Sequence, residues 1–333
     1  MRKLLAAFLT STIVSLSAAA YAEDTLQMLN VSYDPTREFY EAYNREFTQY
    51  WKSKTGKDIK INQSHGGSGK QARAIMDGLN ADVATLALAY DIDVIAERGK
   101  LLEPDWQTKF PHNSAPCDSA IVFLVHKDNP KHIHDWDDLV KDGVQVLTPN
   151  PKTSGGARWN YLAAWGYAYK KNNNNEEAAK AFIAQLFKHV PLLDTGARGA
   201  TTSFTKRGIG DVLITWESEA LLITNKLAKG QYEVVTPSIS ILAEPPVAVI
   251  TKNAQKNGTE AAAHEYLEHL YTKDSQELMA KFYYRPSDPA VLAEHSDIFP
   301  KISLLTIEEM GGWKTVQQKH FVDGGTFDQV YAK

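Results

Sequence analysis

Short apolar runs alternate with amphipathic segments along the first hundred residues of the folded part of the chain. The segment 37–54, for example, carries Phe39, Tyr43 and Phe47 four residues apart, which predicts a helix with one apolar face. The predicted order is strand 26–31, helix 37–54, strand 59–62, helix 71–79, strand 82–88 and helix 91–99. This alternation favours a mostly parallel sheet, with ligand-binding loops at the carboxyl ends of its strands.

The same alternation returns later in the chain. It predicts strands at 120–125, 144–148 and 212–215 and helices at 156–171 and 176–189. Ser114-Ala115-Pro116 and Ala243-Glu244-Pro245-Pro246 interrupt the pattern, and we interpret the segments near 114–120 and 243–250 as hinges. We therefore expect an α/β fold of two lobes, each a mostly parallel doubly wound sheet. Residues 23–115 and 248–333 form lobe 1, residues 116–247 form lobe 2, and the ligand lies in the cleft between them.

The N-terminus has the features of a signal peptide. Arg2 and Lys3 precede an apolar stretch at 4–16, and Ala20-Tyr21-Ala22 supplies small residues for cleavage. The apolar stretch is short for a membrane span, so export with cleavage near Ala22 is favoured over an N-terminal anchor. We expect residues 1–22 to be removed and the mature chain to be periplasmic.

Charge and cysteine content narrow the possible functions. The formal charge of −4 becomes −6 without residues 1–22, which contain two basic residues and no acid. A negatively charged chain lacks the basic excess that nucleic acids require, so no nucleic-acid partner is expected. The single cysteine, Cys117, has no cysteine partner within the chain, so the fold depends on its core alone. The length suffices for that, and we expect a monomer.

The segment 150–159 carries the clearest functional signal. A turn ends in Thr153-Ser154-Gly155-Gly156 and leads directly into a predicted helix. Unpaired N–H groups and the helix dipole at such a start favour an anion, and glycines allow its close approach. Comparable small-residue loops occur at 32–34, 66–69 and 195–199, and Trp216 adds an indole N–H donor at a strand end. An acidic protein would have to hold an anion by these local donors, with Lys152 and Arg158 outside direct contact.

The sequences of these loops do not match the known catalytic or cofactor-binding motifs. The segment 64–71 has Ser64 where a phosphate-binding loop needs glycine and Gln71 where it needs Ser or Thr. A dinucleotide fingerprint beginning at Gly67 fails because position 72 is Ala. No G-x-S-x-G elbow surrounds Ser68 or Ser154. With no metal-ligand pattern either, we expect no cofactor, no metal and no enzymatic activity.

Five blocks of sequence resemble the bacterial periplasmic sulfate-binding proteins. They are 32–37 (SYDPTR), 63–71 (QSHGGSGKQ), 150–158 (NPKTSGGAR), 196–198 (GAR) and 210–217 (GDVLITWE). The resemblance extends in order over the whole mature chain, and the block at 150–158 is its most specific part. It implies a two-lobed (type II) periplasmic binding protein that captures sulfate and delivers it to the transmembrane permease of an ATP-driven (ABC) importer.

The resemblance also implies a set of site residues. Sulfate would be bound by the backbone N–H groups of Ser68, Gly155, Gly156 and Ala197, the Ser154 hydroxyl and the Trp216 indole. Asp34 and Arg198 would support the site by tying the 32–34 turn to the Ala197 peptide. A carrier preferring thiosulfate, or another tetrahedral oxyanion such as molybdate, is the alternative within this class. An exported sulfo- or phosphoester hydrolase is the alternative outside it, and it would need a nucleophile or metal beside the site.

Overall fold

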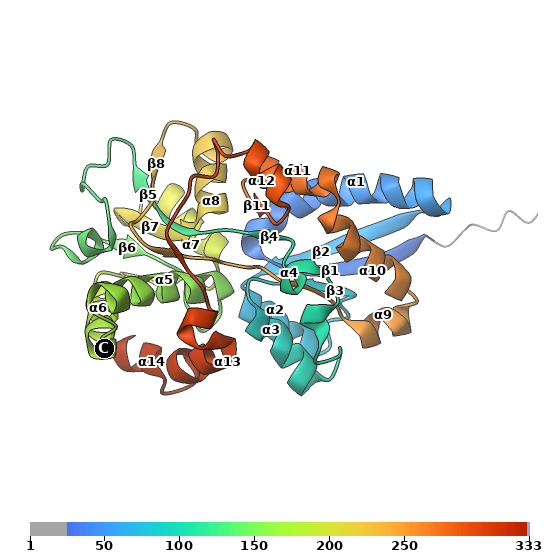
Figure 1. Cartoon of the computed structure of the whole chain (residues 1–333), viewed down its shortest axis with the longest axis horizontal. Helices are drawn as coiled ribbons and strands as arrows, with labels where there is room; N and C mark the ends of the chain where they lie inside the picture. The colour runs from blue at the N-terminus through green and yellow to red at the C-terminus, as the bar shows by residue number, and fades with distance from the viewer. Residues whose placement is uncertain (1–24, 332–333) are drawn as a thin grey trace, which may run out of the picture.

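The computed structural model describes residues 25–331, which form two lobes, each around a four-stranded sheet (Figure 1). The predicted signal peptide at 1–22 lies outside the described residues. Within 25–331, none of the helices combines the length and apolar character that crossing a bilayer would require.

The first sheet has the strand order β10-β3-β1-β2. Strand β1 pairs in parallel with both β2 and β3, as the alternating pattern predicts, and β10 joins antiparallel to β3. Helix α1 buries Phe39, Tyr43 and Phe47 and ends at Gly56 in the left-handed conformation. The elements of lobe 1 are β1 (Leu26–Tyr33), α1 (Arg37–Thr55), β2 (Ile59–Gly66), α2 (Ser68–Met76), β3 (Val83–Thr85), α3 (Ala89–Val94), α4 (Pro111–Ser114), β10 (Val247–Val249), α9 (Thr251–Asn257), α10 (Glu260–Glu268), α11 (Lys273–Lys281) and α12 (Pro289–Glu294).

The second sheet has the strand order β6-β7-β5-β8. Helix α5 crosses the centre of lobe 2 and is buried on every side from Gly155 to Ala168, which explains its Ala-rich and aromatic composition. The elements of this lobe are β5 (Ile121–His126), β6 (Val146–Leu147), α5 (Gly155–Lys171), α6 (Glu176–Lys188), α7 (Ala197–Thr205), β7 (Val212–Trp216), α8 (Glu217–Leu222), β8 (Tyr232–Val235) and β9 (Ser240–Ile241).

Strand directions in the second sheet are more mixed than predicted. Strand β6 is parallel to β7, whereas β5 is antiparallel to both β7 and β8. Strand β5 enters from the other lobe and not from a helix of its own, so it runs against its neighbours. Strand β10 makes the reverse crossing and is antiparallel in the first sheet for the same reason.

Connecting segments run side by side between the lobes (Figure 1). Strand β4 (Cys117–Asp118) pairs antiparallel with β11 (Arg285–Pro286), and Ser119 forms an antiparallel bridge with Ala243. Ser119 and Ala243 fall within the predicted hinge segments near 114–120 and 243–250. A third connection, after β11, has no counterpart in the sequence prediction.

The C-terminal segment packs mainly against lobe 2. Strand β12 (Leu304–Leu305) pairs with β9, and α14 (Thr326–Tyr331) packs on α6, with α13 (Gly312–Val316) between them in sequence (Figure 1). A Cβ built on Gly166 of α5 would lie 2.8 Å from the methyl carbon of Met310, which shows how closely this segment covers the helix. This packing differs from the prediction that all of 248–333 belongs to lobe 1. The exact lobe boundaries stay a prediction.

Candidate functional site

The start of α5 is a capped helix end with free donors. Ser154 is the N-cap, and its hydroxyl oxygen accepts a hydrogen bond from the N–H of Ala157 at 3.3 Å. Because the oxygen acts as the acceptor there, the hydroxyl proton is left for another acceptor. Gly155 and Gly156 follow as the first helical residues, and N–H groups in the first turn have no partner within their own helix.

Ser68 begins a second helix that faces the first. Helix α2 starts at Ser68, three residues earlier than the predicted start at Gln71, so the Ser68 N–H lies in its first turn. The Ser68 hydroxyl donates to Asp91 at 2.6 Å and accepts from the N–H of Ala87 at 3.0 Å. The side chain is thereby fully used inside lobe 1, and the backbone N–H is the group that Ser68 can offer to a ligand.

Gly155 brings these two helix starts into contact. A Cβ built on Gly155 would lie 2.8 Å from the Cβ atoms of both Ser68 and Ala87. Atoms at that separation overlap, so only glycine lets the backbone of α5 approach lobe 1 this closely. The predicted donors of the two lobes therefore share one location.

Trp216 supplies a donor without an acceptor. The side chain is 1% exposed, and its indole Nε1 has no hydrogen-bond partner among the described residues. A Cβ on Gly156 would lie 3.2 Å from this nitrogen and 3.7 Å from the Ser154 oxygen, so all three residues meet. Buried polar groups are nearly always satisfied, and an orphaned N–H at this place indicates a missing acceptor.

Ala197 is the first residue of a third helix, α7, whose start lies at the same place. Gly196 is the N-cap of α7, and a Cβ on it would lie 3.5 Å from the nitrogen of Gly67 and in direct contact with the Asp34 carboxylate. The first turns of α2, α5 and α7 and the Trp216 indole thus lie together. The structure brings the predicted donors into one cluster.

Asp34 precedes α1 but does not cap it. Residues 34–36 form a 3₁₀ turn before the helix, without a side-chain capping bond. The carboxylate instead faces Gly196 and the backbone N–H of Arg198. Burial raises the pKa of Asp34 above its ordinary value, although the Arg198 and Arg37 charges and the Arg198 N–H act in the opposite direction.

Arg198 links the lobes by its side chain as well. Its two terminal nitrogens donate to the two Glu38 oxygens at 2.7 and 2.8 Å, and its Nε lies 3.2 Å from the buried carboxylate of Glu219. Burial alone would raise the pKa of Glu38, but the Arg198 guanidinium outweighs it and holds that pKa below its ordinary value. Glu38 could not be predicted from the sequence, because an acid in the first turn of a helix carries no specific signal.

The two basic side chains beside the α5 start have partners elsewhere. Arg158 forms a buried ion pair with Asp91 at 2.9 Å and donates to the Pro151 carbonyl. Lys152 lies 2.8 Å from Asp328 near the C-terminus. The role of Asp91 as the common partner of Ser68 and Arg158 was not predicted from the sequence.

The cluster offers hydrogen-bond donors and little else. His65 lies near it on β2, and burial lowers its pKa to about 4, so its ring is neutral at pH 7. Its Nε2 is 2.6 Å from the Gln63 amide oxygen. In the part of the chain that the structure describes, no three His, Cys, Asp or Glu side chains gather as candidate metal ligands. Such an arrangement suits an anion that only accepts hydrogen bonds.

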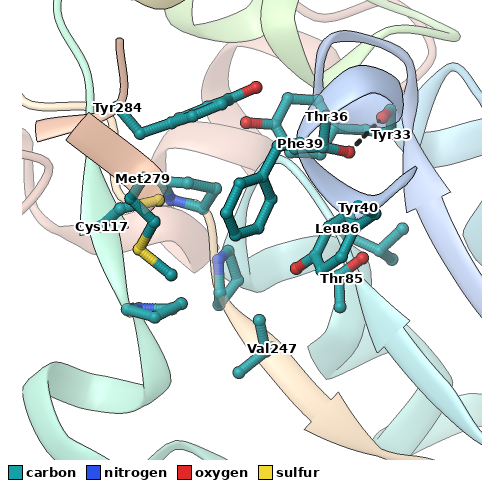
Figure 2. Close-up of a pocket in the computed structure, with 13 residues that line it drawn as sticks. Tyr33, Thr36, Phe39, Tyr40, Thr85, Leu86, Cys117, Val247, Met279 and Tyr284 are labelled. Atoms are coloured by element: carbon teal, nitrogen blue, oxygen red, sulfur yellow. Dashed lines mark hydrogen bonds between the residues drawn. The ribbon is translucent and has the colours of Figure 1, made fainter. Parts of the chain in front are cut away.

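An apolar cavity near the hinge is too small to be a second ligand site. Figure 2 shows it between Phe39, Tyr40 and Leu86 on one side and Cys117, Met279 and Tyr284 on the other. Its volume is about 10 Å³, which is about the minimum for one water molecule. Burial raises the pKa of the Cys117 thiol, so this cysteine is an inert packing residue.

Known proteins resemble this chain over nearly its full length. The family of bacterial extracellular solute-binding proteins matches residues 18–285. A sulfate-binding protein of Salmonella typhimurium is 58% identical over 320 residues, which are 96% of this chain and 97% of that protein. A thiosulfate-binding protein of Pseudomonas aeruginosa is 51% identical over 333 residues, covering 100% of this chain and 99% of that one. The structure of the sulfate-binding protein SubI from Mycobacterium tuberculosis H37Rv aligns with a TM-score of 0.80 and 32% identity, over 89% of this chain and 99% of SubI.

Proposed function

Because the chain belongs to the bacterial extracellular solute-binding proteins, we propose that it captures sulfate between its lobes and delivers it to an ATP-driven importer. The observation that carries this proposal is the buried indole N–H of Trp216, which has no hydrogen-bond partner within residues 25–331 and lies beside the helix start at Gly156. A donor left unsatisfied in a protein interior is costly, and an anion at this place would remove the cost.

The chemistry of sulfate suits the cluster. Sulfate is a full dianion at neutral pH and offers acceptors only, and the site residues proposed for it are donors only. These are the N–H groups of Ser68, Gly155, Gly156 and Ala197, the Ser154 hydroxyl and the Trp216 indole. Two carboxylates beside the cluster, those of Asp34 and Asp91, accept hydrogen bonds from donors of the protein itself.

The number of donors is sufficient for useful affinity. A hydrogen bond to a charged group contributes about 1.5–3 kcal/mol, so six bonds give on the order of 10 kcal/mol before the costs of ordering. Micromolar affinity requires about −8 kcal/mol. Six such bonds span about 9–18 kcal/mol, and the upper part of that range leaves this much after costs of several kcal/mol, so micromolar affinity is reachable without a direct countercharge.

Thiosulfate is the second candidate ligand. Its support is the thiosulfate-binding relative from Pseudomonas aeruginosa, which is 51% identical. Isothermal titration of the purified mature chain with sulfate and with thiosulfate tests both. Micromolar or tighter binding of sulfate is expected, whereas a clear preference for thiosulfate would reverse the assignment, and binding of neither would refute it.

The surroundings of the site fit transport better than catalysis. The relatives are named for binding, and the Ser68 hydroxyl already donates to Asp91 within its own lobe. A hydrolase acting at this site would turn over a chromogenic sulfate ester, and we expect no turnover. We place the mature chain in the periplasm as a monomer, where the closed lobes would present sulfate to a membrane permease.

A further inference from the structure

Gly67 lies where the backbones of the two lobes approach each other closely. It precedes α2 in lobe 1, and a Cβ built on it would lie 2.6 Å from the carbonyl oxygen of Thr153 and 2.8 Å from that of Thr195. Both carbonyls belong to loops of lobe 2, ahead of α5 and α7 respectively. The backbone of lobe 1 thus rests directly against two backbone groups of lobe 2.

The two carbonyls have little freedom to move away. The Thr153 hydroxyl donates to the Thr195 carbonyl at 2.8 Å and thereby joins the two loops. The Thr153 N–H is itself bonded to the Asn150 carbonyl at 3.1 Å. An added side-chain atom at position 67 would meet a fixed surface, and the lobes would have to separate to make room.

The structure of lobe 1 by itself does not require glycine at position 67. Gly67 has φ −59° and ψ 131°, a conformation that any L-residue adopts readily. It is the N-cap of α2, where serine is preferred over most residues. The need for glycine therefore arises from the contact between the lobes and not from the local backbone.

We propose that Gly67 is a positioning residue that sets how far the lobes close on the ligand. When the carbonyls of Thr153 and Thr195 contact Gly67, the N–H of the next residue, Ser68, lies beside the helix starts of lobe 2. A side chain at position 67 holds the lobes apart, and one anion can then no longer contact all the donors. Affinity falls although every proposed donor is still present. This inference rests on the proposed function.

The test compares Gly67→Ser with Gly66→Ala. Serine suits the N-cap, so Gly67→Ser is expected to fold normally. Gly66 is a matched control, since a Cβ there would meet only Gln71 of the same lobe, at an ordinary 3.4 Å. The measurements are titration with sulfate and thiosulfate, sulfate dissociation rate, radius of gyration by X-ray scattering with and without sulfate, and urea unfolding without ligand.

For Gly67→Ser we expect an unchanged unfolding midpoint, little compaction on adding sulfate, and about a tenfold or greater loss of sulfate affinity through faster dissociation. Thiosulfate, whose terminal sulfur is larger than oxygen, should lose less. Gly66→Ala should resemble the wild type in every measurement.

Two results would overturn the proposal. One is equal binding and equal compaction in Gly67→Ser and the wild type. The other is a lowered unfolding midpoint in Gly67→Ser, which would mark Gly67 as a structural residue of lobe 1. Failure of the wild type to bind either anion would instead count against the proposed function.

Discussion

The buried guanidinium of Arg158 donates to the carboxylate of Asp91 over 2.9 Å, and the two residues come from opposite lobes. The same carboxylate accepts the Ser68 hydroxyl at 2.6 Å. Asp91 therefore joins the start of α2 to the first turn of α5, the two helix starts proposed to hold the ligand. A link of this kind ties lobe closure to the arrangement of the donors.

Replacing Asp91 with asparagine should weaken ligand capture. Asp91→Asn keeps the size of the side chain but leaves the Arg158 charge buried without a counterion whenever the lobes close. Breaking a buried ion pair costs about 3–5 kcal/mol, so a loss of sulfate affinity of about 100-fold or more is expected by calorimetry. Asp323→Asn, at an exposed partner of Lys152, is the control and should bind as the wild type does. Unchanged affinity in Asp91→Asn would show that closure does not depend on this pair.

Replacing Trp216 with phenylalanine should remove one donor and little packing. Hydrogen bonds to charged groups contribute about 1.5–3 kcal/mol, which predicts a loss of roughly 10- to 100-fold in sulfate affinity. Trp136→Phe is the matched control, because its indole donates to the Ile239 carbonyl at 2.8 Å. That control should lose stability and keep its affinity. Equal affinities in the two variants would argue against an indole donor in the site.

Replacing Ser154 with alanine should affect two properties at once. Ser154→Ala removes the N-cap of α5, worth about 1 kcal/mol of stability, and also the hydroxyl donor proposed for the ligand. Asn175→Ala removes the cap of α6, where the side chain accepts from Ala178 at 3.0 Å, and serves as the comparison. Urea unfolding should show similar losses in both variants, while titration should show weaker sulfate binding in Ser154→Ala alone.

Replacing Gly155 with valine should reduce sulfate binding below detection. Even the first added carbon would lie 2.8 Å from Ser68 and Ala87, and two further methyl groups leave no room for the lobes to meet. The expected readout is an absence of heat on titration, together with a sulfate-independent radius of gyration. Tight binding by Gly155→Val would mean that the lobes hold the ligand without this contact.

A carboxyl in the hinge, that of Asp118, should make the free energy of unfolding depend on pH. Burial, with the nearby Glu244 charge, raises the pKa of Asp118 in β4 from 3.8 to about 7, against the opposing effect of Arg285. Between these values the folded protein binds more protons than the unfolded one, so this residue makes stability fall as pH rises from about 4 to about 7.

Asp118→Asn removes this dependence. The variant should exceed the wild type by about 1 kcal/mol or more at pH 8 in urea unfolding, and the difference should shrink toward pH 4. Asp105→Asn is the contrasting control, because the Lys109 ammonium lowers the pKa of that exposed carboxyl, and no gain at pH 8 is expected there. A wild-type stability that is flat between pH 4 and 8, with no gain in Asp118→Asn, would contradict the prediction.

Local sequence patterns predicted the elements well and their partners less well. The helix at 37–54 and the helix at 156–171 are confirmed within one residue at each end, because apolar spacing and small residues at helix starts act within a few turns. The predicted start of α2, at Gln71, was three residues too late, because the glycines at 66, 67 and 69 are typical of a loop. Local sequence also gave no sign that the carboxylate of Asp34 would face the backbone N–H of Arg198 and leave α1 without a side-chain cap.

The sequence by itself determined which backbone segments could offer free N–H groups, and that these donors had to act without net positive charge. Only the tertiary structure decided which residues meet across the lobes. Arg158 is 67 positions from Asp91, and Arg198 is 160 positions from Glu38. Helix starts and strands arise from interactions among near neighbours, which leave a periodic trace in the sequence. Contacts between lobes depend on where two separately folded sheets come to rest, and a glycine such as Gly67 shows its role only when the opposing carbonyls are in place.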